Sequence, residues 1–327
     1  MCLPLIHNKR STLKPMPPNK ENILIIKLGA LGDFIQALGP MQAIRSHHPD
    51  AKITLLTTKP FEALVQKSGH CDEIWIDEKP RFFEFSKWRS LKKQFNEGQF
   101  LRVYDLQNND RTSFYFKLFN PKPEWSGVAK GASHRNNSKE RTAGQAFDGH
   151  KMTLKVAGID DVKIDTLEWI QADLSNFNLR GKYALIIAGS APQHPYKRWP
   201  AIRYGKICKE LCNQGIQSVL LGTDAEREIT AQIKQACPDC LDLTGQTSLD
   251  QIAVLSRSAL FALGNDTGPM HLIAPTGCPT IVLFSKYSNP VRHAPKGPCV
   301  KTLKVDDLND LSIPMVSAAI SEYLPKQ

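Results

Sequence analysis

Residues 259–274 read ALFALGNDTGPMHLIA, which predicts a buried strand, a polar turn and the start of a helix. The turn leaves backbone N–H groups free at the N-terminus of that helix, and the Thr267 hydroxyl and the His271 imidazole lie beside them. Free N–H groups and the helix dipole favour anions, so the turn predicts a site for a phosphate or diphosphate. A capped helix with a hydrogen-bonded histidine is the alternative interpretation.

A second strand–turn–helix segment lies near the other end of the chain. Residues 23–26 (ILII) predict a buried strand, and residues 27–33 (KLGALGD) join it to a helix whose apolar residues recur at helical spacing. Asp33 at the start of this helix either caps the backbone or faces the crevice at the carboxyl end of a parallel sheet, where ligands bind. The Gly-x-x-Gly spacing is not that of a dinucleotide-binding turn, and the sequence contains no P-loop motif.

Alternation of strands and helices predicts an α/β protein with two doubly wound, parallel-sheet domains that face a central cleft. The alternation starts at residue 23 and restarts at residue 184, so we expect domains at 21–175 and 176–327, with a last helix able to pack back on the first domain. Residues 1–20 predict a loose basic leader, and residues 120–145 a basic, loop-rich stretch. Strands are expected at 23–26, 53–56, 74–76, 101–105, 184–187, 218–221, 241–243, 259–263 and 280–284.

The composition is that of a globular protein, with 41% hydrophobic and 23% charged residues. No apolar run reaches the roughly 18 residues that a membrane-spanning helix needs. One Cys-x-x-Cys pair, Cys237 and Cys240, lacks the second pair or the histidines of a zinc site. We therefore predict free thiols in a reducing cytoplasm and no metal site.

The net charge of +10 is concentrated in the first half, where residues 1–150 hold 23 Lys and Arg against 15 Asp and Glu. Within residues 79–141 the ratio is 14 to 6, and aromatic residues are interleaved. A solvated surface is one interpretation; the other is a surface for nucleic acid, lipid headgroups or an acidic glycan. Candidate acceptor-binding residues in this segment are Lys92, Lys93, Arg111, Arg135 and Arg141.

Two further loops follow predicted strands of the second half. In the loop after strand 184–187, Ser190 offers a hydroxyl and Lys197 a mobile charge that can reach a diphosphate, with Arg198 as the alternative cation. After the next strand, Asp224 either accepts hydrogen bonds from a ribose diol or caps the helix that follows.

The motifs and their order resemble those of glycosyltransferase family 9, the ADP-heptose:lipopolysaccharide heptosyltransferases. The resemblance covers about residues 23–298. It depends on five segments: IKLGALGD (26–33), KRWP (197–200), LLG (220–222), LTGQTSL (243–249) and NDTGPMH (265–271). The segments GCPT (277–280) and NP (289–290) extend it.

The resemblance implies a GT-B fold of two Rossmann-like domains and an inverting, metal-independent sugar transfer. It implies that Asp33 is the general base and that Lys197 neutralises the donor diphosphate, with Gly32 among the acceptor contacts. The donor-binding residues that it implies are Lys197, Asp266, Thr267, Gly268 and His271, and Ser190 and Asp224 join them as the donor candidates identified above. Cations, backbone amides and a helix dipole are what a transferase without a metal needs to stabilise a departing nucleoside diphosphate.

We therefore expect an enzyme that moves a heptose from ADP-heptose to a lipopolysaccharide core or a related anionic glycolipid, with no cofactor and no metal. The alternatives are a GT-B transferase that uses another nucleotide sugar, a sugar-nucleotide epimerase or hydrolase, and a non-enzymatic module that binds anionic surfaces. We expect a cytoplasmic monomer that contacts the cytoplasmic face of the inner membrane peripherally and binds no nucleic acid.

Overall fold

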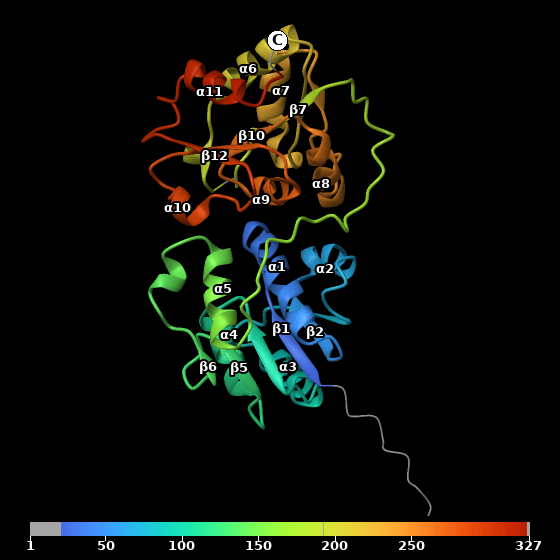
Figure 1. Ribbon diagram of the computed structural model, residues 1–327, viewed down its shortest axis with the longest axis vertical. Helices are drawn as coiled ribbons and strands as arrows, with labels where there is room; N and C mark the ends of the chain where they lie inside the picture. Colours follow the sequence, from blue (N-terminus) through green and yellow to red (C-terminus); the bar gives the residue numbers. More distant parts are fainter. Residues whose placement is uncertain (1–20, 192, 326–327) are drawn as a thin grey trace, which may run out of the picture.

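The computed structural model describes residues 21–191 and 193–325, so the leader predicted at residues 1–20 lies outside the described chain. Two open sheets, each of six parallel strands, form two domains stacked one on the other (Figure 1). The prediction of an α/β protein with two parallel, doubly wound sheets is confirmed.

The first domain contains the sheet with strand order β3-β2-β1-β4-β5-β6. Its elements are β1 (Asn22–Ile26), α1 (Leu31–His47), β2 (Lys52–Thr57), α2 (Lys59–Gln66), β3 (Glu73–Ile76), α3 (Phe85–Glu97), β4 (Arg102–Asp105), α4 (Asp110–Tyr115), β5 (Glu124–Gly127), β6 (His134–Arg135) and α5 (Ala146–Val156). Two 3₁₀ turns, η1 (Phe116–Leu118) and η2 (Glu140–Thr142), complete it.

The second domain repeats this plan with strand order β12-β11-β10-β7-β8-β9. Its strands and helices are β7 (Tyr183–Ile187), α6 (Ala201–Asn213), β8 (Gln217–Leu220), α7 (Arg227–Ala236), β9 (Leu241–Asp242), α8 (Leu249–Ser258), β10 (Ala262–Asn265), α9 (Gly268–Ile273), β11 (Thr280–Phe284), α10 (Pro290–His293), β12 (Val300–Lys304) and α11 (Ile313–Ser321). Its 3₁₀ turns are η3 (Pro195–Lys197), η4 (Asp224–Glu226) and η5 (Ala274–Thr276).

Both sheets reverse their strand order at a central pair, β1 and β4 in the first domain and β7 and β10 in the second. The central strands are buried almost throughout, because helices cover both faces of a parallel sheet. Ligands of such sheets bind outside the carboxyl ends of the strands at the point of reversal. The turns after β1 and β10 therefore occupy the two ligand-binding edges.

One cluster of buried apolar side chains continues from the α1 side of the first sheet to the α8 and α9 side of the second. The domains are therefore in apolar contact. The segment 157–182 connects them along one side of the molecule (Figure 1) and contributes Leu167 and Ile170 to that cluster. The boundary predicted between residues 175 and 176 falls in this segment and stays a prediction.

Three expectations about local structure were wrong. The stretch 120–145 contains two strands, β5 and β6, and β12 was not expected at all. These strands lie at or next to sheet edges, where short or half-exposed segments lack the continuous apolar pattern of central strands. Strand β10 also begins three residues later than expected.

The last helix, α11, packs within the second domain rather than back on the first. Its buried residues Val316, Ala319 and Ile320 share a cluster with Tyr204 and Ile207 of α6. In the first domain, α3 and α4 already cover the face of the sheet opposite α1.

Candidate active site between the two domains

Helices α1 and α9 bring the two domains into contact. Gln36 on α1 accepts a hydrogen bond from the Phe147 backbone N–H at 3.1 Å, and its amide nitrogen lies 3.1 Å from His271 Nδ1 on α9. Because the Gln36 oxygen is used by Phe147, its NH₂ group donates to Nδ1, which leaves the proton of His271 on Nε2. Burial lowers the pKa of His271, against the Asp266 and Asp33 carboxylates, which raise it. We infer a neutral ring held in one orientation.

Gly32 is the point of closest approach between these helices. A Cβ atom built on Gly32 would lie 2.7 Å from Cδ2 of His271, and one built on Gly268 would lie 3.1 Å from Leu31. Across the same interface Lys296 donates to Asp148 at 2.9 Å, and Lys67 pairs with Asp250. Gly32, predicted to contact the acceptor, therefore has an observed role in joining the domains.

This contact predicts that Gly32→Ala destabilises the protein by about 1–3 kcal/mol, because the added methyl overpacks a buried ring. A loss of stability would be informative, since replacing glycine by alanine inside a helix ordinarily stabilises the protein by about 0.5–1 kcal/mol. Thermal unfolding of Gly32→Ala in the wild-type and His271→Ala backgrounds measures the coupling. We expect the loss largely to disappear when the ring is absent; an equal loss in both backgrounds would place the strain elsewhere.

Asp33 is exposed and faces a cavity of about 240 Å³ formed by both domains. The first domain contributes Lys27, Asn108, Arg141 and His150 to its lining, among others, and α10 of the second domain contributes Arg292 and His293. Asp33 lies in the first turn of α1, whose N-cap position is occupied by Ala30. Asp33 itself is therefore not the N-cap residue, and its carboxylate faces a cavity bordered by cationic groups.

Three buried polar residues lie in or next to the wall of this cavity, and sequence analysis did not identify any of them as site residues. Lys27 donates to the Leu106 carbonyl at 3.2 Å, and burial lowers the pKa of Lys27 to about 8, against nearby Asp33 and Asp105, which raise it. Burial raises the pKa of Asp105 to about 6 although it accepts two backbone N–H bonds. Burial also lowers the pKa of His150 well below its usual value. The available signal was position, because Lys27 follows β1 and Asp105 ends β4.

Several polar atoms around this cavity lack a partner within residues 21–191 and 193–325. Arg141 Nε, His150 Nε2 and Asn108 Oδ1 are buried without a hydrogen bond, and all three residues line the cavity. Unpaired buried polar atoms are costly unless a ligand or water completes them. Arg141, predicted to bind acceptor, is thus brought together with Asp33.

A second cavity of about 500 Å³ adjoins the first and shares Gln107 with it. Lys79 and Arg111 line it, and the Arg111 guanidinium donates to the Pro80 carbonyl and to the Tyr115 hydroxyl. Of the other predicted acceptor residues, Lys92 and Lys93 are exposed on α3, and Arg135 is exposed on the edge strand β6. None of these three lines either cavity.

On the second domain, the structure joins two residues predicted for the donor site. Lys197 Nζ donates to Asp266 Oδ2 at 2.7 Å, and the Ser288 hydroxyl donates to the same oxygen at 2.5 Å. The neighbouring Asn265 is fully buried and bonds both the Trp199 N–H and the Ala188 carbonyl, which fixes the 188–200 loop against β10. Sequence analysis missed Asn265 and Ser288 as supports of this pair.

The remaining predicted donor residues have mixed surroundings. Within the described chain, Thr267 occupies the N-cap position of α9 but its side chain makes no capping hydrogen bond, and α9 is only six residues long. Ser190 is buried, donates to the His194 carbonyl at 2.9 Å and accepts from Arg198, so its hydroxyl is already paired. Asp224 is not the helix cap, because Thr223 has that role; Asp224 pairs with Arg227.

Residues 21–191 and 193–325 contain no group of three or more His, Cys, Asp or Glu side chains placed to hold a metal ion. Over the same ranges, no helix is both long and apolar enough to cross a membrane.

Comparison with known proteins agrees with this geometry. The chain is 24% identical over 295 residues to lipopolysaccharide heptosyltransferase 2 of Salmonella typhimurium, covering 81% of this chain and 83% of that protein. It is 28% identical over 297 residues to lipooligosaccharide heptosyltransferase 2 of Haemophilus influenzae, covering 82% and 84%. The structure of the E. coli heptosyltransferase WaaC with ADP has the same fold, with a TM-score of 0.72, 16% identity and coverage of 93% and 100%.

The model of glycosyltransferase family 9 (heptosyltransferase) matches residues 88–312, more than two thirds of the chain. The fold is therefore GT-B, as the resemblance implied. The protein is a glycosyltransferase that belongs to family 9.

Proposed function

We propose that this enzyme transfers a heptose from ADP-heptose to a lipopolysaccharide core or a related anionic glycolipid. The observation that carries the proposal is the contact between α1 and α9, where Gly32 packs against the His271 ring. Asp33 directly follows Gly32 on α1, and Asp266, which holds Lys197, lies just before the start of α9. The base candidate and the diphosphate-binding candidate therefore belong to the two sides of one domain contact.

In the proposed reaction, Asp33 accepts the proton of the acceptor hydroxyl as that oxygen attacks the anomeric carbon of the heptose. The bond from the anomeric carbon to the diphosphate oxygen breaks on the opposite face, which inverts the configuration. The electron pair leaves with ADP, whose negative charge Lys197 neutralises. Lys197 is already positioned by its ion pair with Asp266. When the diphosphate binds, the Lys197 ammonium therefore exchanges one anionic partner for another.

We propose that the reaction requires no metal, because Lys197 and the turn at 267–268 offer the leaving diphosphate a cation and backbone N–H groups. We also propose that the enzyme is a cytoplasmic monomer. A single chain supplies both walls of the cleft, which is consistent with a monomer.

The acceptor is proposed to carry a carboxylate or phosphate close to the attacked hydroxyl. The cavity at Asp33 presents Lys27, Arg141 and Arg292 against one exposed carboxylate. An anionic group there would pair with Arg141, whose Nε lacks a hydrogen bond within the described structure. This pairing would hold the acceptor with its hydroxyl toward Asp33.

We expect Arg141→Gln to raise the acceptor KM by about 10- to 100-fold, since a hydrogen bond to a charged group contributes about 1.5–3 kcal/mol. The KM for ADP-heptose should stay unchanged, because Arg141 belongs to the first domain. Initial rates with each substrate varied in turn make the measurement. Arg135→Gln is the matched control, since Arg135 lies outside both cavities. Equal effects of the two variants would contradict the assignment.

The function is tested directly by release of ADP from ADP-heptose in the presence of a heptose-deficient core acceptor. ADP release that requires the acceptor supports transfer, whereas release without acceptor would favour a hydrolase. Acceptor-dependent release of a nucleoside diphosphate only from a different nucleotide sugar would support a GT-B transferase but would reject heptose as the transferred sugar. The same assay in the presence of a chelator tests whether a metal is required. Loss of rate that is restored by a divalent ion would overturn the metal-independent mechanism.

A further inference from the structure

The loop before α3 and the first residue of that helix expose three phenylalanine rings to solvent. The exposed fractions are 89% for Phe82, 66% for Phe83 and 72% for Phe85. Solvent-exposed aromatic rings in a cluster forgo the free energy of burial, about 25 cal/mol for each Å² of apolar surface. Such a cluster on a folded protein marks an interaction surface.

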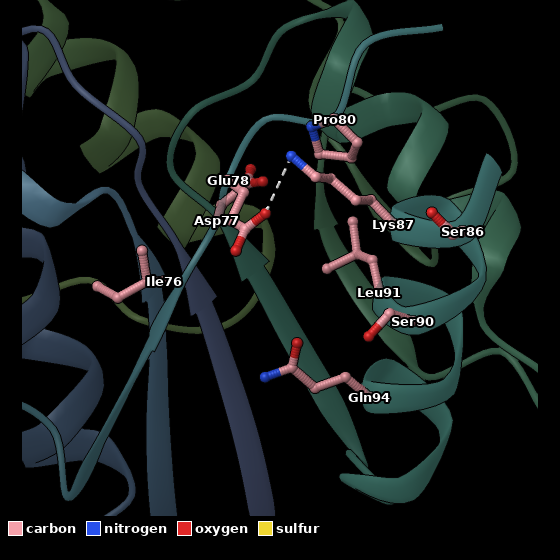
Figure 2. A pocket seen from close by; sticks show the side chains of 9 residues that line it. All are labelled: Ile76, Asp77, Glu78, Pro80, Ser86, Lys87, Ser90, Leu91 and Gln94. Atoms are coloured by element: carbon pink, nitrogen blue, oxygen red, sulfur yellow. Dashed lines mark ion pairs between the residues drawn. The ribbon is translucent and has the colours of Figure 1, made fainter. Parts of the chain in front are cut away.

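The loop is braced, so the exposure of its rings is built into the fold. The Arg81 backbone N–H donates to Glu84 Oε2 at 2.6 Å, and Trp88 Nε1 donates to the Arg81 carbonyl at 3.0 Å. Lys87 forms ion pairs with Glu84 and Glu78 at 2.9 and 3.3 Å, the second of which Figure 2 shows across the neighbouring cavity. These contacts hold the backbone that carries the three rings.

That cavity, of about 370 Å³, lies between β3 and α3 and is lined by Glu78 and Lys87 among others (Figure 2). Of its three charged residues, Glu78 and Lys87 pair with each other, and the Asp77 carboxylate accepts hydrogen bonds from the Tyr115 hydroxyl and the Lys79 N–H, so all three are already partnered. The rings rather than the cavity are the feature that needs a partner.

The sequence around the rings carries a net positive charge. Residues 77–93 contain six Lys and Arg against three acidic residues, Asp77, Glu78 and Glu84. All six basic side chains are exposed, and Glu84 is already paired with Lys87. Exposed aromatic rings bordered by basic residues are the pattern of a segment that lies in the interface of an anionic membrane.

The position of the loop relates this surface to the active site. The loop follows β3, and its start at Pro80 accepts hydrogen bonds from Arg111. Arg111 and Lys79 line the cavity that adjoins the one at Asp33. A membrane at the loop would therefore lie at the outer end of a path that leads to the base candidate.

We infer that residues 81–85 insert the rings of Phe82, Phe83 and Phe85 into the headgroup region of an anionic bilayer, with the surrounding Lys and Arg against lipid phosphates. Binding itself is independent of the sugar transfer. The benefit to catalysis, access to an acceptor embedded in the same bilayer, depends on the proposed function.

Sedimentation with phosphatidylcholine vesicles containing about one third phosphatidylglycerol tests the inference without any sugar substrate. We expect the wild type to bind, and Phe82→Ser/Phe83→Ser/Phe85→Ser to bind at least about tenfold more weakly. Ile202→Ser/Met315→Ser is the matched control, because it removes two exposed apolar side chains from the second domain. Binding by the triple variant equal to that of the wild type, or no binding by the wild type, would overturn the inference. The second outcome would assign the rings to a protein partner.

Two further experiments separate the contribution of the basic residues from that of the aromatic rings. Lys92→Glu/Lys93→Glu should weaken binding to anionic vesicles, and neutral vesicles should bind the wild type poorly. With a water-soluble acceptor, the triple variant should transfer sugar at the wild-type rate, while with a vesicle-embedded acceptor it should be slower. Vesicle binding without any ADP release would reject the proposed function and leave the membrane surface intact. A slower rate with the soluble acceptor would assign the rings to the acceptor site instead of the membrane.

Discussion

Replacing Asp33 by Asn is expected to slow transfer by about 10²- to 10⁴-fold, the usual contribution of a general base. The amide cannot accept the proton of the acceptor hydroxyl, although it fills the same space. Binding of ADP-heptose should change little, because Asp33 lies on α1 of the first domain. Single-turnover rates and equilibrium titration with ADP-heptose measure the two effects separately.

Asp50→Asn provides a control for this variant, since Asp50 is an exposed carboxylate in the turn after α1. It should leave both rate and donor affinity unchanged. A loss of donor affinity in Asp33→Asn as large as the loss of rate would instead indicate that Asp33 supports the structure of the cleft. Normal transfer by Asp33→Asn would remove it from the mechanism.

Lys197→Ala is expected to reduce kcat by about 10²- to 10³-fold, the range for loss of one group that stabilises developing negative charge. Donor affinity should fall as well, because the same ammonium would contact the diphosphate of the bound substrate. Steady-state kinetics and ADP titration report the two effects. The ion pair with Asp266 must be considered in the interpretation, since removing Lys197 leaves that carboxylate with Ser288 alone.

Thermal unfolding without ligand therefore accompanies this variant, and Lys197→Ala/Asp266→Asn removes both charges. If the defect came only from an unpaired Asp266, the double variant would regain activity. We expect the double variant to stay as slow as Lys197→Ala. Kinetics of Lys197→Ala equal to those of the wild type would transfer the proposed role to Arg198, which the structure bonds to Ser190.

The central strands and the turns at their carboxyl ends were predictable because their signals are local. Asp33, Lys197 and Asp266 each lie in the segment that follows a buried apolar run, so their place at the carboxyl edge of a sheet followed from the fold class. Strands β5, β6 and β12, which lie at or next to the sheet edges, were missed because their sequences lack that apolar run. The repeated alternation of strands and helices along the chain predicted the two-sheet fold.

The wall behind Asp33 could not be predicted in this way. Lys27, Asp105 and His150 come from distant parts of the sequence and meet only when the sheet forms. A buried charge also contradicts the usual expectation that polar residues lie outside. Conversely, charge density alone selected Lys92, Lys93 and Arg135, because it does not tell which face of a helix or strand borders a cavity.

The contact between Gly32 and His271 has a mechanical consequence. Rotation of one rigid body against another displaces each atom in proportion to its distance from the axis. Asp33 is adjacent in sequence to this contact, so a hinge located there would hardly shift the carboxylate relative to the donor side. Such a hinge would let the two domains rotate against each other while Asp33 keeps its alignment with the donor side.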